Sequence, residues 1–126
     1  MEREIIAVTE RLLNAVGAGD FATYAQLSDA ALTCIEPETC GTIVEGLAFH
    51  KHFFPKTALP GLLPKQNHVS AARVHVLGPD AAVIAYVRVI QGPGDKVVTA
   101  EETRAWRRDR VGGQWKDIHF HRSSRL

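Results

Sequence analysis

Hydrophobic positions near the start of the chain follow the period of an α-helix. Apolar side chains recur every three or four residues, at Ile5, Val8, Leu12 and Val16. This spacing predicts an amphipathic helix over residues 2–16, and we expect the glycines at positions 17 and 19 to end it. Asp20 suits the N-cap of a second, shorter helix that reaches about Leu27.

The next forty residues carry weaker patterns. Residues 31–36 predict a first strand, which breaks at a proline, and residues 37–46 predict a loop. A short helix is expected over residues 47–54, because the proline at position 55 disfavours helical backbone before it. Residues 55–66 contain three prolines and predict an irregular connection.

The second half of the chain is rich in β-branched and aromatic residues. Four strand-like runs cover residues 68–77, 82–91, 96–108 and 114–122. Glycine-containing turns join them, which predicts hairpins and hence an antiparallel meander. Helices that precede a sheet, without strand–helix alternation, indicate an α+β fold. We therefore expect one domain, residues 1–126, in which N-terminal helices pack on a strongly curved antiparallel sheet to form a conical roll.

Composition excludes few functions but makes some improbable. The formal net charge is +1, and 23% of the residues are charged. This balance predicts no nucleic-acid or membrane surface, and no apolar run has the length to span a bilayer. We expect a soluble, cytoplasmic protein without a cofactor. Cys34 and Cys40 predict two reduced thiols, with a local disulfide as the alternative.

The most informative chemistry lies in three arginines placed inside apolar strand patterns, Arg88, Arg104 and Arg122. Arginine is rarely buried unless it is paired or lines a pocket. One interpretation is that each arginine pairs with a carboxylate or lies in water at a strand end. The other is that the three converge on a pocket for a carboxylate, which guanidinium groups bind through parallel hydrogen bonds. The candidate internal partners are Glu36, Glu38, Glu102 and Asp117.

Histidine and cysteine spacings give only weak metal signals. His50 and His52 are two apart on a predicted helix, which is poor spacing for metal ligands, and the two cysteines need partners from elsewhere. His119 and His121 share a strand face and have the spacing to chelate, but we interpret them as surface or interface histidines. We therefore expect no metal.

Six motifs resemble the association (hub) domain of calcium/calmodulin-dependent protein kinase II. They are Asp20–Tyr24, Ile35–Glu38, Val44–His50, Ala85–Arg88, Glu101–Trp106 and His119–Ser123. The resemblance runs from about Glu4 to Ser123 and implies a nuclear-transport-factor-2-like (ketosteroid-isomerase-like) cone. It also implies homo-oligomerisation, because hubs of this family form two-tiered rings of stacked dimers, usually of twelve or fourteen subunits.

The same resemblance implies a binding cavity. The cavity arginines of the family match Arg88, Arg104 and Arg122, and a tyrosine near the cavity mouth matches Tyr24. A histidine on the preceding strand corresponds to His68. We expect Glu102 to help neutralise the arginines.

Two functions are compatible with these observations. The first is a scaffold without catalytic activity that gathers copies of itself, together with kinase domains fused to it or bound in trans; its cavity binds a small carboxylate or an acidic docking peptide. No kinase domain or calmodulin-binding segment is present, so we expect an excised hub or a free-standing hub-like protein. The alternative is a dimeric small-molecule-binding or catalytic cone of the isomerase or dehydratase type. Subunit contacts are expected from Phe49, Phe53, Phe54 and Leu62.

Overall fold

The computed structural model describes residues 1–57, 66–92, 94 and 96–123. Within these residues the elements follow in the order α1 (Glu2–Ala18), α2 (Phe21–Gln26), β1 (Ser28–Ile35), a 3-10 turn η1 (Pro37–Thr39), β2 (Val44–Glu45), α3 (Ala48–Thr57), β3 (Gln66–Gly78), β4 (Ala81–Gln91), β5 (Val97–Arg107) and β6 (Lys116–Arg122). The α+β class predicted from the sequence is confirmed.

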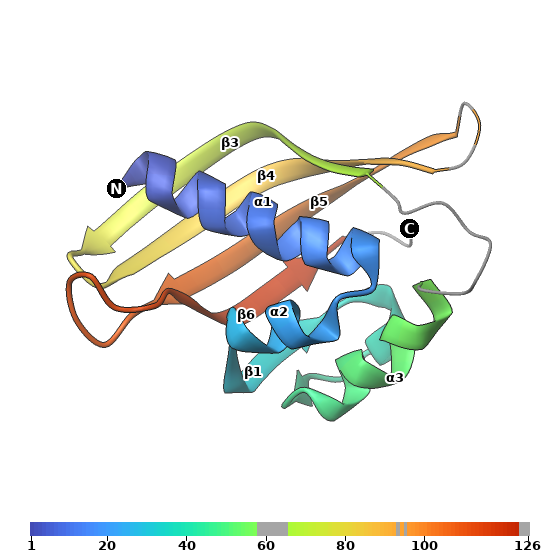
Figure 1. The fold of residues 1–126 in the computed structure, drawn as a ribbon, viewed down its shortest axis with the longest axis horizontal. Coiled ribbons are helices and arrows are strands. Elements are labelled where there is room, and N and C mark those ends of the chain that lie inside the picture. Colours follow the sequence, from blue (N-terminus) through green and yellow to red (C-terminus); the bar gives the residue numbers. More distant parts are fainter. Residues whose placement is uncertain (58–65, 93, 95, 124–126) are drawn as a thin grey trace.

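The strands form one curved sheet in the order β2-β1-β6-β5-β4-β3. Strands β3 to β6 make the predicted antiparallel meander. Strand β1 joins its edge in parallel to β6, so the sheet is mixed rather than wholly antiparallel. In Figure 1, α1 lies across one face of this sheet, and α2 and α3 lie beside the end that carries β1.

The ends of α1 and α2 follow from their capping residues. Helix α1 continues through the buried Gly17 and ends at Gly19, whose φ of 70° is left-handed, a conformation that glycine adopts at little cost. Asp20 then caps α2 by accepting a hydrogen bond from the Thr23 amide at 3.1 Å. The chain therefore turns sharply between the two helices.

Helix α3 differs from its prediction. It continues through Pro55 to Thr57 instead of ending at Phe54. Pro55 has no N–H to donate to the carbonyl four residues earlier, so the helix loses that bond, and it continues for only two residues beyond the proline. The predicted interface residue Leu62 lies outside the described residues.

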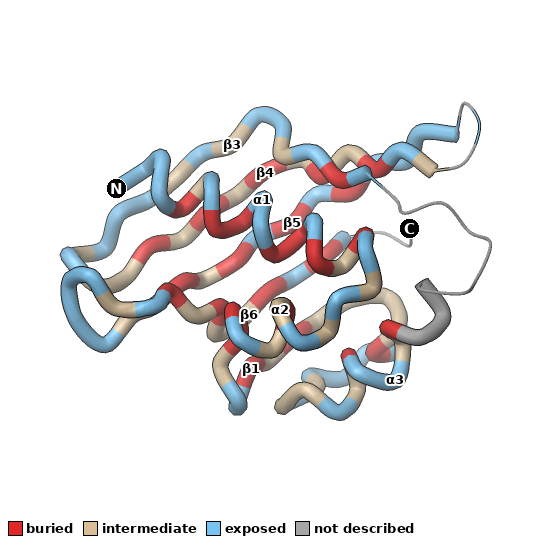
Figure 2. Tube along the Cα trace, viewed as in Figure 1, coloured by how far each residue is buried: buried red, intermediate tan, exposed pale blue. Residues whose placement is uncertain are grey.

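The core lies between α1 and the concave face of the sheet (Figure 2). Ile5, Leu12 and Leu13 of α1 are fully buried, as are Ile84 of β4 and Trp106 of β5. The Trp106 indole donates to Thr9 Oγ1 at 3.1 Å, which fixes the register of α1 on the sheet. This layer closes one side of the cavity described below.

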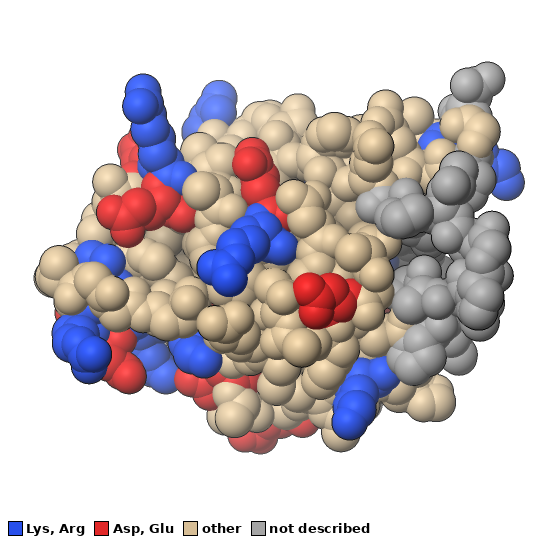
Figure 3. Space-filling view, viewed as in Figure 1, with Lys and Arg blue, Asp and Glu red and all other residues tan. Residues whose placement is uncertain are grey.

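The surface on the helical side carries charges of both signs, interspersed rather than gathered into one patch (Figure 3). Among the described residues, no helix combines the length and apolar character needed to cross a bilayer. Both cysteines are free thiols, Cys34 buried and Cys40 exposed.

Candidate functional site

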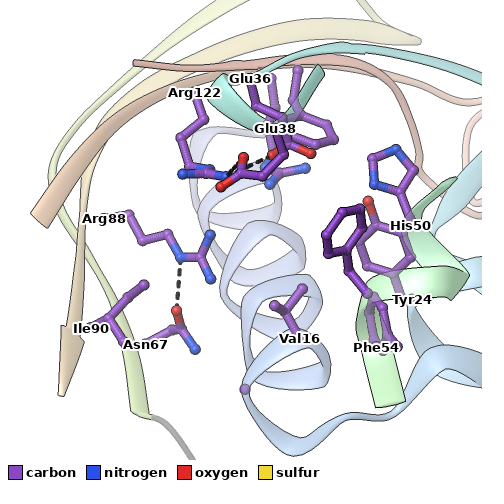
Figure 4. A pocket seen from close by; sticks show the side chains of 14 residues that line it. Val16, Tyr24, Glu36, Glu38, His50, Phe54, Asn67, Arg88, Ile90 and Arg122 are labelled. Atoms are coloured by element: carbon purple, nitrogen blue, oxygen red, sulfur yellow. Dashed lines mark hydrogen bonds and ion pairs between the residues drawn. The ribbon is translucent and has the colours of Figure 1, made fainter. Parts of the chain in front are cut away.

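A cavity of about 250 Å³ opens between the helices and the concave face of the sheet. All three predicted arginines line it, together with the predicted Tyr24. Figure 4 shows Arg88 and Arg122 reaching in from the sheet, opposite a wall made by Tyr24, His50 and Phe54. Strand alternation brings the arginines together, since inward positions on β4, β5 and β6 fall side by side across the meander.

Glu102 is the centre of a buried polar network. Its two carboxylate oxygens accept from Arg88 Nη1 at 2.9 Å, from Arg104 Nη2 at 3.2 Å and from the Tyr86 hydroxyl at 2.5 Å. Burial acts to raise the pKa of Glu102, but the guanidiniums of Arg104 and Arg88 outweigh it and hold the pKa at about 2. The carboxylate is therefore ionised at any physiological pH.

Arg104 is fully engaged by protein groups. Its Nε donates to Tyr86 at 2.9 Å, Nη2 to Glu102 and Nη1 to Asp117 at 2.5 Å. Its guanidinium also lies 4.3 Å from the centre of the Phe120 ring. Because every nitrogen of its guanidinium has a partner, Arg104 holds the network together and has little capacity left for a ligand.

A bulge in β6 makes the Arg104–Asp117 pair possible. Asp117 pairs with Trp106, and His119 with Ala105, which leaves Ile118 as an extra residue. Asp117 therefore points inward, as do Phe120 and Arg122, where strict alternation would turn it outward. Burial raises the pKa of Asp117 to about 6 although Arg104 opposes the shift.

Arg122 contacts two carboxylates from the segment that follows the neighbouring strand, β1. Its Nη2 donates to Glu36 at 3.0 Å and to Glu38, and both acids lie next to η1 or within it. Burial raises the pKa of Glu36, while Arg122 works in the opposite direction. Two carboxylates facing one guanidinium leave this end of the cavity with a surplus of negative charge.

These contacts confirm the pairing interpretation for all four predicted carboxylates, and the three arginines still border one cavity. Arg88 differs from the other two. Its Nε donates to Asn67 Oδ1 at 2.8 Å and its Nη1 to Glu102. Across the described part of the chain, its Nη2 has no hydrogen-bond partner, so this guanidinium nitrogen is available to donate to a ligand.

The prediction for His68 is wrong. Its side chain is exposed, and Nε2 lies 3.2 Å from the amide oxygen of Gln91. Side chains alternate along β3, so its neighbour Asn67 takes the inward position and contacts Arg88 instead. Sequence reasoning missed Asn67, although its spacing of two residues from Val69, which packs against the core, places both on the inward face of β3.

The opposite wall of the cavity is aromatic. Tyr24 packs against Phe54 and His50, with ring centroids 5.0 and 5.7 Å apart, and burial raises its hydroxyl pKa. Phe54 is buried in the core of its own chain, so it is not the exposed contact residue that we predicted. Phe49 and Phe53 stay partly exposed. The spacing of His50 to His52 does not indicate a site, yet His50 is buried and lines the cavity.

Helices folded over a curved sheet around one cavity define the nuclear transport factor 2 (NTF2)-like class. An NTF2-like protein from Rhodospirillum rubrum has this fold, with a TM-score of 0.74 and 27% identity over 97% of this chain and 98% of that chain. Within the class, the chain belongs to the calcium/calmodulin-dependent protein kinase II association domain family, whose model matches residues 1–125. The resemblance indicated by the six motifs is thereby confirmed.

Two relatives support this assignment. The hub homology domain from Chlamydomonas reinhardtii is 37% identical, with a TM-score of 0.85 and 98% coverage of both chains. The delta subunit of the type II kinase from Oryctolagus cuniculus is 43% identical over 97% of this chain. The match spans 23% of that subunit, so it is confined to a minor part of a longer protein.

Proposed function

We propose that the chain is a single association domain that assembles with copies of itself into a two-tiered ring of stacked dimers, with twelve, fourteen or more subunits. Membership of the association domain family carries this proposal. The domain has no catalytic activity of its own. It acts by concentrating whatever is fused to it or bound in trans, a kinase domain in the case of the rabbit relative.

A two-tiered ring needs two kinds of contact, one within each dimer and one around the circle. The convex face of the sheet offers the first surface. Val83, Ala85, Val87 and Val89 form an apolar stripe along β4, on the side away from α1. Polar residues of β3 and β5 flank the stripe, and an apolar patch with a polar rim is the usual anatomy of a protein interface. Phe49 and Phe53, partly exposed on α3, are candidates for the second surface.

The assembled mass tests this proposal. Native mass spectrometry or light scattering of the wild type should give a particle of at least twelve subunits. Val87→Glu places a charge in the apolar stripe and should reduce the particle to smaller species. Val111→Glu is the matched control, because Val111 is 72% exposed in the turn before β6, and its particle should keep the wild-type mass.

A wild-type monomer or dimer at micromolar concentration would contradict the ring. The dimer would favour the alternative function, a small-molecule-binding cone. If Val87→Glu still forms a particle of wild-type mass, the ring proposal is kept, but the convex face is ruled out as one of its subunit contacts.

We further propose that the cavity binds a small carboxylate or an acidic peptide side chain. Arg88 Nη2 carries this proposal, since Arg88 lines the cavity and this nitrogen has no hydrogen bond to a described residue, whereas Nε and Nη1 are engaged by Asn67 and Glu102. Arg88 is 7% exposed, so an ion pair formed there is shielded from water.

A thermal-shift assay with a panel of small carboxylates should show stabilisation that disappears in Arg88→Ala. Arg73→Ala, on exposed strand β3, is the control and should keep it. Stabilisation that persists in Arg88→Ala would refute the assignment.

A further inference from the structure

Three potential metal ligands meet at the carboxylate-rich end of the cavity. Cys34 is the buried residue next to the last position of β1, Glu36 precedes η1, and His50 lies on α3. One ligand atom from each lies within 4.8 Å of the other two. Elements distant in sequence thus bring a thiol, a carboxylate and an imidazole to one point, the ligand types that zinc prefers.

His50 supplies an independent sign that this point is built for a ligand. Its side chain is 6% exposed, and Nε2 is buried without a hydrogen-bond partner among the described residues. The ring is held between aromatic neighbours, with centroids 5.5 Å from Phe120 and 5.7 Å from Tyr24. A buried nitrogen without a partner costs free energy, and a neutral imidazole offers one ring-nitrogen lone pair to a metal.

The second sign is the orientation of Glu36. Its Oε2 is held by Arg122 at 3.0 Å, and its Oε1 lies 4.0 Å from the Cys34 sulfur. One oxygen is therefore fixed by a charged partner while the other faces the thiol. Outer hydrogen bonds of this kind orient the ligands of protein metal sites.

The local charge balance favours a cation. Arg104 and Arg122 are the guanidiniums that face the cluster. Arg104 pairs with Asp117 and shares Glu102 with Arg88, and Arg122 faces Glu36 and Glu38, so that three guanidiniums stand against four carboxylates. One carboxylate is thus in excess before the thiol ionises. The two positive charges of a divalent ion bound there would balance this extra carboxylate and the Cys34 thiolate.

We propose that Cys34, Glu36 and His50 form a binding site for one zinc-type divalent cation. The Cys34 thiol releases its proton to solvent as the sulfur–metal bond forms. Tetrahedral zinc places its ligand atoms about 3.3–3.8 Å apart, so each pair of ligand atoms, now within 4.8 Å, closes by about 1.5 Å at most around the ion. The fourth position faces the cavity, because Glu36 and His50 both line it (Figure 4). The site does not depend on ring assembly.

Cobalt(II) substitution tests the site. Metal-stripped, reduced protein is titrated with Co²⁺ while absorbance is recorded, because a thiolate ligand gives a near-ultraviolet sulfur-to-cobalt charge-transfer band and tetrahedral geometry gives strong visible bands. The wild type should bind one Co²⁺ per chain with both signatures, and one Zn²⁺ should displace it. Cys34→Ser preserves size but should lose the sulfur band. Cys40→Ser changes the exposed cysteine and should leave both bands intact.

His50→Gln is the second variant, and it should lose stoichiometric binding. A wild type without the sulfur band would overturn the proposal, as would a band that survives in Cys34→Ser or disappears in Cys40→Ser. If Cys34→Ser fails to fold by circular dichroism, the decision passes to His50→Gln, and unchanged Co²⁺ affinity there sinks the site. Particle mass, measured on the same samples, reports separately on the ring.

Discussion

At the scale of single residues, the cavity is organised by charge pairing. Glu102 accepts from two guanidiniums and one hydroxyl while being 2% exposed, and each of the three guanidinium nitrogens of Arg104 donates to a protein group. A buried ion is stable only where charged or hydrogen-bonding partners offset the loss of its hydration. The arginines therefore differ in role: Arg104 maintains the network, whereas Arg88 keeps one nitrogen for the cavity.

Glu102→Gln should reveal this pairing in the pH dependence of stability. The folded-state pKa of Glu102 is about 2, against an ordinary value of 4.5. Its ionised form therefore stabilises the fold fully above pH 4.5, and that contribution, at most about 3 kcal/mol, is lost as the pH falls from 4.5 toward 2. In urea titrations at several pH values, the variant should be less stable at pH 7 and show a shallower acid-side slope.

The matched control is Glu101→Gln. Glu101 is the exposed neighbour on the opposite face of β5 and has a hydrogen bond from Ser123 at 3.0 Å. It should keep the wild-type slope between pH 4.5 and 2. Equal slopes in the wild type and Glu102→Gln would mean that the carboxylate is not selectively stabilised in the fold.

At the scale of elements, the site depends on how helices and strands begin, end and deviate. The bulge at Ile118 turns Asp117 toward Arg104, and the left-handed Gly19 lets α2 fold back beside α1. Neither feature contacts the position proposed for a ligand in the cavity. Both determine which side chains point into the cavity and where they lie.

Gly19→Val should destabilise the fold, and Gly19→Asn should do so much less. Residue 19 has φ 70° and ψ 22°, where a β-branched side chain is strained and asparagine is tolerated. We expect a loss of about 1–2 kcal/mol for valine and well under half of that for asparagine. Chemical denaturation midpoints measure both, and equal midpoints would show that the helix end does not need this conformation.

Thr9→Val tests the contact that holds α1 on β5. The substitution keeps the side-chain volume but leaves the buried Trp106 N–H without its acceptor, which should cost about 1–3 kcal/mol. A Trp106→Phe background removes that N–H, so the same substitution should cost clearly less there. Additive losses in the double-mutant cycle would show that the hydrogen bond contributes nothing.

At the scale of the whole molecule, the sheet has two faces with different roles. The concave face is covered by α1 and carries the charged cavity, while the convex face presents the β4 stripe. Exposing such an apolar stripe to water costs a monomer free energy, and burying it between subunits stabilises an assembly. The cavity and the proposed interface therefore lie on opposite sides of the same strands.

Assembly should make thermal stability depend on concentration. If subunits dissociate before or during unfolding, the Tm of the wild type should rise with protein concentration by mass action. Val87→Glu should weaken this dependence, and Val111→Glu should preserve it. Differential scanning calorimetry over a hundredfold concentration range provides the measurement, and a wild-type Tm that stays constant would argue against coupled dissociation.

Much of the fold and part of the site could be predicted from the sequence. The helical period of Ile5 to Val16 and the β-rich second half define the α+β class, because local periodicity follows directly from backbone geometry. Strand alternation also places the three arginines on one face. By contrast, the assignment of His68 failed through an offset of one residue, since a shift of one reverses the face of every side chain in a strand.

The sequence by itself determined the main helices and the long strands and which arginines point inward, because these follow from short-range spacing along the backbone, but it missed η1 and β2 in the predicted loop 37–46. Only the tertiary structure decided which carboxylate meets which arginine, that β1 runs parallel to β6, and that a bulge turns Asp117 inward. It also brought His50 to Cys34 and Glu36, a meeting that spacing in sequence cannot encode. The physical reason is that these contacts join residues far apart in the chain, whose approach is set by packing of the whole core.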